Sequence, residues 1–172
     1  MTISQDSLPK AKHTALGLYV SAKEAYAQWR AEPDKVKIID VRTPEEYLFV
    51  GHPTMAWKIP VATQSYEWDA EKKQFPLQLL TDFAARVQTV AQPGDTIMVM
   101  CRSGGRSAIA ANLLAKAGFT KVYNIIDGME ADANADSETV AQAQPLKDGW
   151  KNSGCPWTKA LTPERLVLPK TN

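Results

Sequence analysis

The chain has 172 residues, of which 44% are hydrophobic and 23% are charged, and its formal net charge is +1. Such values are ordinary for a globular protein of one domain. The small net charge argues against nucleic acid or an anionic membrane as the main partner. No apolar run approaches the ~20 residues that a membrane-spanning helix requires, so we expect no membrane span.

The cysteines and histidines are too few and too scattered to predict a cofactor site. Cys101 and Cys155 are the only cysteines, which rules out a disulfide scaffold. His13 and His52 do not combine with them into a metal-ligand cluster. We therefore expect no metal ion and no other cofactor.

The N-terminal residues lack the basic region followed by an apolar stretch that marks a signal peptide. A cytoplasmic location is therefore the default expectation. A periplasmic location would apply if a signal peptide had been removed from the sequence.

Helices are predicted at several places along the chain, after a flexible N-terminal tail over residues 1–13. Two of them begin where Ser or Thr is followed three residues later by Glu, the spacing of a capping box. These are 21–30, with Ser21 and Glu24, and 43–50, with Thr43 and Glu46. Apolar residues at helical spacing predict two more, and a short last helix is expected before the C-terminal tail. These are 77–91, with Leu79, Leu80, Phe83 and Val87 on one face, 107–118, and 144–154.

Strands are predicted from short apolar runs between these helices, of the type that is buried in a parallel sheet. The runs are 35–41, 56–62, 96–100 and 121–126. Residues 62–76 have no steady period and are expected to form a long loop, and 131–145 are not assigned. The alternation of helices and strands predicts an α/β fold, with an open parallel sheet and helices on both faces.

A loop with the residues of an anion site follows the strand over 96–100. In open parallel sheets, ligands bind outside the carboxyl ends of the strands. The first N–H groups of a helix lack internal partners and carry partial positive charge, and paired glycines let a loop curl these groups inward. Such surroundings favour a thiolate, which is the nucleophilic form of cysteine. The loop residues are Cys101, Arg102, Ser103, Gly104, Gly105, Arg106 and Ser107.

Each side chain of the loop has a functional and a structural interpretation. Arg106 is expected to bind the substrate anion, with a bridge to a nearby carboxylate or carbonyl as the alternative. Arg102 either steers anions or simply points to solvent. Ser103 and Ser107 either hydrogen-bond to the sulfur of Cys101 or cap the helix.

The loop "CRSGGRS" resembles the active-site loop of the rhodanese family of sulfurtransferases. Three further stretches resemble motifs of that family in the same order, so the resemblance spans roughly residues 16–157. They are "IIDVRTPEEYLFVGH", "VYNIIDGMEA" and "GWKNSGCPW".

The resemblance implies a rhodanese fold, with a five-stranded parallel sheet and helices on both faces. It implies a rhodanese domain over 14–157, followed by a C-terminal tail over 158–172. It also implies that Cys101 accepts sulfane sulfur from a small anionic donor such as thiosulfate and holds it as a persulfide. Cyanide, a thiol or the cysteine of another protein would then accept the sulfur, whereas Asp40 and Arg42 would brace the architecture.

Two other functions stay open at this stage. One is a rhodanese-like sulfur-carrier or sensor module, which binds partners and has weak free turnover. The other is a cysteine-dependent phosphatase or arsenate reductase. Phosphatase loops have five residues between Cys and Arg, whereas four separate Cys101 from Arg106. The shorter loop favours sulfur transfer.

Two further features are expected to have structural roles, with functional roles as alternatives. Cys155 is expected to be a packed apolar thiol, with resolution of the persulfide or a disulfide as alternatives. The loop over 62–76 carries the aromatic residues Tyr66, Trp68 and Phe75. These aromatic side chains either cover an edge of the core or wall a substrate pocket.

Overall fold

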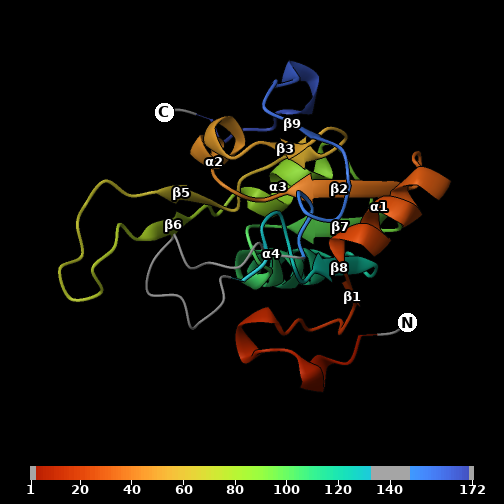
Figure 1. Cartoon of the computed structure of the whole chain (residues 1–172), viewed down its shortest axis with the longest axis horizontal. Helices are drawn as coiled ribbons and strands as arrows, with labels where there is room; N and C mark the ends of the chain where they lie inside the picture. Colours follow the sequence, from red (N-terminus) through yellow and green to blue (C-terminus); the bar gives the residue numbers. More distant parts are fainter. Residues whose placement is uncertain (1–2, 133–147, 171–172) are drawn as a thin grey trace.

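A five-stranded parallel sheet forms the centre of the computed structural model, which describes residues 3–132 and 148–170 (Figure 1). The strand order across the sheet is β1-β8-β7-β2-β4, and every neighbouring pair is parallel. This arrangement confirms the predicted sheet. Its strands are β1 (Tyr19–Val20), β2 (Val36–Asp40), β4 (Trp57–Lys58), β7 (Thr96–Met100) and β8 (Val122–Ile125).

Helices cover both faces of this sheet, as predicted. The cluster of buried residues on one face includes α1, and the cluster on the other face includes α3 and α4. The bounds are α1 (Ala22–Ala31), α2 (Pro44–Phe49), α3 (Phe83–Gln88) and α4 (Gly105–Lys116). Both predicted capping boxes are present, at the first residues of α1 and α2.

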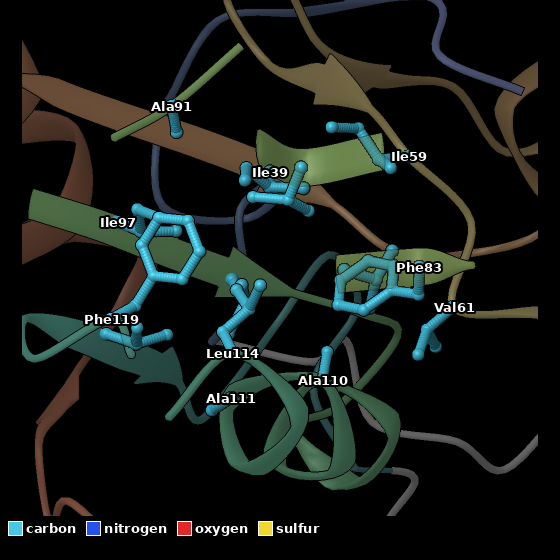
Figure 2. Packing of buried hydrophobic residues seen from close by; sticks show 14 of the residues in the cluster. Ile39, Ile59, Val61, Phe83, Ala91, Ile97, Ala110, Ala111, Leu114 and Phe119 are labelled. Carbon is cyan, nitrogen blue, oxygen red and sulfur yellow. The ribbon is translucent and has the colours of Figure 1, made fainter. Parts of the chain in front are cut away.

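The core between the sheet, α3 and α4 places the end of β7 beside α4 (Figure 2). Side chains alternate between the two faces of a strand. Ile97 and Val99 of β7 therefore pack against Leu114 of α4, whereas Met98 and Met100 belong to the cluster on the α1 side. Cys101 comes next in this alternation and joins the cluster on the α4 side.

The segment after β4 forms a hairpin rather than a long loop followed by a long helix. Strands β5 (Ala62–Gln64) and β6 (Leu77–Leu79) pair antiparallel, and the hairpin extends away from the sheet in Figure 1. The predicted helix over 77–91 is therefore wrong in its first part, and α3 begins only at Phe83. Leu79 was expected to face the core, but it lies in β6 and is 57% exposed.

The two terminal segments pack on the domain, whereas a flexible tail was expected over residues 1–13. The N-terminal residues form two 3-10 turns, η1 (Gln5–Ser7) and η2 (Lys10–Lys12), and η2 packs against α4. At the other end, Leu166 forms a parallel bridge with Lys58 of β4. Shorter elements complete this region: β3 (His52–Pro53), which pairs with β9 (Trp157–Thr158), and η4 (Pro163–Arg165). The limits of a domain over 14–157 remain a prediction.

The last predicted helix, over 144–154, lies only partly within the described residues. Residues 148–154 form turns, with the Asn152 and Ser153 amides bonded to the Gly149 carbonyl. Most of the unassigned stretch 131–145 lies outside the described residues. Among the helices of the described ranges, none has the length and apolar character to span a lipid bilayer.

Candidate active site around Cys101

Cys101 stands where β7 ends, at the carboxyl edge of the sheet. The paired neighbour of Met100 is Asp40, the last residue of β2, so two adjacent strands end at this point. Cys101 is only 2% exposed. Helix α4 begins at Gly105, two residues before the predicted Ser107, so the loop between strand and helix contains only four residues, Cys101 to Gly104. The short loop places the thiol at the N-terminal end of α4.

The Cys101 sulfur is contacted from two sides by the loop and the first turn of α4. The Gly104 amide donates to Sγ at 3.1 Å, and the Ser107 hydroxyl oxygen lies 3.4 Å from Sγ. Gly104 has a φ of +104°, and a Cβ at this position would lie 2.6 Å from the Ile126 carbonyl oxygen. Only glycine therefore fits where the chain turns its N–H toward the sulfur.

The neighbouring Gly105 has a different environment. A Cβ at Gly105 would meet nothing within 4 Å, and its backbone is not left-handed. The two glycines of the loop were predicted to act together in curling the chain. The structure assigns this conformational role to Gly104 alone.

Arg106 binds a carboxylate of the neighbouring helix α2. Its two terminal nitrogens donate to the two carboxylate oxygens of Glu46, each at 2.7 Å. The same Glu46 accepts the Thr43 amide in the capping box of α2. Burial alone would raise the pKa of Glu46, but Arg106 and Thr43 outweigh it and the pKa is lowered. The bridge to a carboxylate, which was the alternative role of Arg106, is therefore present, and substrate binding by Arg106 remains a prediction.

The first part of the loop is fixed through its backbone. The carbonyls of Cys101 and Arg102 accept the amides of Met129 and Glu130, each at 2.9 Å. Gly128 makes this approach feasible, because a Cβ there would collide with both carbonyl oxygens. The Arg102 side chain is exposed, which fits both of its interpretations, the steering of anions and a side chain that simply points to solvent.

Two polar residues outside the loop, Asn124 and Lys12, support it through hydrogen bonds, and neither was predicted from the sequence. Asn124 of β8 is fully buried, and its amide nitrogen lies 3.0 Å from the Gly104 carbonyl and 3.1 Å from the Lys12 carbonyl. Its oxygen lies 2.6 Å from the Ser107 hydroxyl. The Lys12 ammonium donates to the Ile126 carbonyl at 2.9 Å. The one signal in the sequence was a polar Asn inside the apolar run 121–126.

Asp40 and Arg42 form a buried ion pair beside the site, as expected for bracing residues. Arg42 Nη2 lies 2.6 Å from Asp40 Oδ2 and also donates to the Gly51 carbonyl. The Tyr47 hydroxyl lies within hydrogen-bond distance of the carbonyls of Asp40 and Arg42. Burial would lower the pKa of Arg42, but the Asp40 carboxylate raises it above its ordinary value. These contacts fix the turn between β2 and α2.

Cys155 is a buried thiol on the other face of the sheet. It belongs to the cluster around α1, whereas Cys101 belongs to the cluster on the α4 side. Burial raises the pKa of the Cys155 thiol. Both cysteines are free, which fits the expected packed apolar thiol.

The aromatic side chains of the hairpin are largely on the surface. Trp68 and Phe75 pack edge to face with their ring centroids 5.2 Å apart, and Tyr66 is 84% exposed. The default prediction, that these rings cover an edge of the core, therefore does not hold for Tyr66. Within the described ranges, no group of three or more His, Cys, Asp or Glu side chains is placed to hold a metal ion.

Comparison with known proteins gives one consistent family. The family model described as "Rhodanese-like domain" matches residues 21–135. An uncharacterized protein of Rickettsia prowazekii is 35% identical over 120 residues, which cover 70% of this chain and 80% of the relative. "Thiosulfate sulfurtransferase 16, chloroplastic" of Arabidopsis thaliana is 35% identical over 95 residues, covering 55% of this chain and 72% of that protein.

Solved structures agree on the fold. The crystal structure of Rv0390 from M. tuberculosis has a TM-score of 0.61 and 24% identity, and the match covers 82% of this chain and 96% of that one. The polysulfide-sulfur transferase homodimer of Wolinella succinogenes has a TM-score of 0.50 and 21% identity, with 86% and 81% of the two chains covered. The family model, the Rickettsia relative and the shared fold agree with the four sequence motifs, and the chain belongs to the rhodanese-like family.

Proposed function

We propose that this protein is a sulfurtransferase that carries sulfane sulfur as a persulfide on Cys101. The observation that carries the proposal is the position of the Cys101 sulfur at the N-terminal end of α4, with the Gly104 amide 3.1 Å away. An amide donor at a helix N-terminus stabilises negative charge. Such a position therefore favours the anionic form of a sulfur atom, which is the reactive form.

The proposed reaction has two displacement steps. In the first step, the Cys101 thiolate attacks the outer sulfur of thiosulfate, an S–S bond forms, and sulfite leaves with the electrons of the broken S–S bond. In the second step, cyanide or a thiolate attacks the terminal sulfur of the persulfide, and the Cys101 thiolate leaves. In each step an anionic nucleophile displaces an anionic leaving group, so no cofactor is needed, and no general base is needed once the thiol is ionised.

The proposal gives each remaining part of the loop a role. The Gly104 amide donates to the sulfur, and the first N–H groups of α4, which a helix leaves without intrahelical partners, would stabilise the charge of the persulfide. Arg102 is exposed and attracts the anionic donor by long-range steering. Arg106 adds positive charge that Glu46 partly offsets.

The related Arabidopsis protein is named a thiosulfate sulfurtransferase, which supports thiosulfate as the donor to test first. The spacing of four residues between Cys101 and Arg106 also supports sulfur transfer over phosphoryl transfer. The physiological acceptor is a thiol or a protein cysteine in this proposal, with cyanide as the laboratory acceptor.

Intact mass spectrometry after incubation with thiosulfate tests the proposal. We expect the protein to gain the mass of one sulfur atom and to lose it, as thiocyanate, when cyanide is added. Cys101→Ser should abolish the gain, and Cys155→Ser is the matched control that should retain it. A gain of sulfur by Cys101→Ser equal to that of the wild type would refute the proposal.

Two further measurements, of the rate of sulfur transfer and of phosphate release, distinguish the two other functions. A sulfur-carrier module would gain the sulfur on Cys101 but would turn over slowly with cyanide and quickly with one particular acceptor protein. A phosphatase would release phosphate from an aryl phosphate and would lose this activity in Cys101→Ser. Phosphate release without any gain of sulfur would replace the proposed function.

A further inference from the structure

The buried side chain of Asn124 determines where the hydroxyl proton of Ser107 points. The Asn124 amide nitrogen lies 3.0 Å from the Gly104 carbonyl oxygen and 3.1 Å from that of Lys12. Carbonyl oxygens only accept hydrogen bonds, so the group that faces them must be the NH₂ of the carboxamide. The oxygen of the carboxamide then faces Ser107, at 2.6 Å.

Ser107 has one hydroxyl proton and two neighbours that compete for it. An amide oxygen only accepts, so the short contact to Asn124 Oδ1 requires Ser107 to donate there. The Ser107 oxygen then presents a lone pair to the Cys101 sulfur, 3.4 Å away. A protonated thiol can donate to this lone pair, whereas a thiolate or a persulfide anion cannot.

Ionisation of Cys101 therefore favours rotation of the Ser107 hydroxyl toward the sulfur. When the thiol proton leaves to solvent, the sulfur gains the Ser107 hydroxyl as a second donor beside the Gly104 amide. Asn124 Oδ1 then loses its donor, and a buried acceptor without a partner is unfavourable. The two arrangements of one hydroxyl thus correspond to the two charge states of the sulfur.

We propose that Asn124 is a positioning residue that controls the charge state of Cys101 through the hydroxyl of Ser107. Asn124 does not touch the sulfur itself; it competes with the sulfur for one proton. The inference rests on the proposed function in taking Cys101 as the reacting thiol.

Charged groups around Cys101 come from several elements, and none of these residues is substituted in the variants below. Arg106 of α4 is paired with Glu46 of α2, and Lys12 of the N-terminal segment is paired with Asp132. Arg102 of the loop is exposed. The buried pair of Asp40 and Arg42 lies at the end of β2. These residues are the same in all variants, and the comparison with and without the Ser107 hydroxyl separates the effect of the hydroxyl from a change in this background charge.

The test is the midpoint pH of iodoacetamide alkylation of Cys101, in full-length protein with Cys155→Ser. Asn124→Ala frees the Ser107 hydroxyl for the sulfur, so we expect the midpoint to fall by about half a pH unit to one unit. In a Ser107→Ala background, the same Asn124→Ala change should have no effect on the midpoint. A double-mutant cycle of this kind isolates the coupling between the two residues.

A purely structural role for Asn124 gives a different result. It predicts the same shift with and without the Ser107 hydroxyl, and such a result would overturn the inference, as would an unchanged midpoint. Asn112→Ala is the matched control, because Asn112 also binds the N-terminal segment, through the Ala15 amide, but Asn112 has no hydrogen bond to the Cys101 loop in the described structure. An equal shift in this control would also overturn the inference.

Asn124→Leu serves if Asn124→Ala does not fold, since it fills the volume of the carboxamide and also lacks the acceptor for Ser107. Its midpoint should fall as with Asn124→Ala, and the fall should disappear when Ser107 is alanine. An identical fall in both backgrounds counts against the inference. Alkylation does not need sulfur transfer, so a failure of sulfur loading with the expected midpoint shifts refutes the proposed function alone.

Discussion

The two sides of the Cys101 loop are held by different physical forces. On the inner side, Gly104 and Ser107 contact the sulfur and rest on the uncharged amide of Asn124. On the outer side, Gly105 faces open space and Arg106 is held by the carboxylate of Glu46. The inner side is buried, whereas the ion pair of the outer side is about one-fifth exposed.

This difference determines how each side responds to the solution. Hydrogen bonds between uncharged groups respond little to salt, whereas a partly exposed ion pair responds to both salt and pH. The inner side fixes where the sulfur lies and, in the proposed coupling through Ser107, biases its charge state. The outer side adjusts the electrostatic field that an anionic donor meets.

The substitutions Gly104→Ala and Gly105→Ala test the difference between the two sides most directly. The largest effect on stability is expected for Gly104→Ala. Alanine at position 104 adopts an unfavourable positive φ and clashes with the Ile126 carbonyl, so the free energy of unfolding should fall by about 2 kcal/mol or more. Alanine at position 105 meets open space and improves helix propensity, so stability should stay equal or rise by up to about 1 kcal/mol. Urea unfolding measures both values, and equal losses would contradict the division into two sides.

Glu46→Gln alters only the outer side. Glutamine also completes a capping box, so α2 stays capped while Arg106 loses its opposing charge. The divalent donor should then bind more tightly, and we expect the KM for thiosulfate to fall about 3-fold to 10-fold at low ionic strength. Steady-state kinetics at low and high salt measure the change, which high salt should diminish.

Glu24→Gln is the matched control for that variant. It makes the same charge change in the capping box of α1, where Glu24 accepts from Ser21 and from no residue of the Cys101 loop in the described structure. Its KM should equal that of the wild type. A fall of similar size in both variants would show that net charge, and not the pair with Arg106, sets the affinity.

Lys12→Met tests the support of the inner side by the N-terminal segment. Methionine retains the aliphatic stem that passes Gly104 but removes the ammonium that binds the Ile126 carbonyl, so the free energy of unfolding should fall by about 1 kcal/mol. Lys10→Met is the control, since Lys10 is exposed in the same 3-10 turn. Thermal unfolding measures the two variants side by side, and no difference between them would mean that this support is absent.

Acid should weaken the ion pair between Arg106 and Glu46 on the outer side. This effect on stability is the smallest of those predicted. The pKa of Glu46 is lower in the folded protein than the ordinary value of 4.5, because Arg106 and Thr43 outweigh the effect of burial. Its ionised form therefore stabilises the fold above pH 4.5, and this contribution is lost as the pH falls through the lowered value. The stability difference between wild type and Glu46→Gln should be below about 1 kcal/mol at pH 7 and should vanish in acid. A difference that grows as the pH falls would reverse the assigned sign.

The sequence predicted the elements whose signals are local. Both capping boxes, four of the five strands of the main sheet, and the position of the Cys101 loop between β7 and α4 follow from short patterns within the chain. Strand β1 was not predicted, because its two residues are too few to show a period. The hairpin was not predicted, because leucines at 79 and 80 continue the helical spacing of α3. Only the pairing with β5 makes residues 77–79 a strand.

The site was predicted only as far as one continuous loop allowed. Cys101 and its neighbours lie together because they follow one another in the chain. Asn124, Lys12 and Glu46 reach this loop from β8, the N-terminal segment and α2, and the strand order that brings them together is not visible in a periodic pattern. Arg106 illustrates the limit, since its residue type fits both a substrate anion and a carboxylate.

The bridge between Leu166 and Lys58 has a consequence for the behaviour of the protein at high concentration. Strand β4 is the last strand of the sheet, and an uncovered last strand offers free amides and carbonyls to a second molecule. The Val167 amide donates to the Lys58 carbonyl at 3.0 Å, and Arg86 binds the Val167 carbonyl. The C-terminal segment thus shields this border of the sheet, and its removal would leave the protein prone to strand-to-strand aggregation.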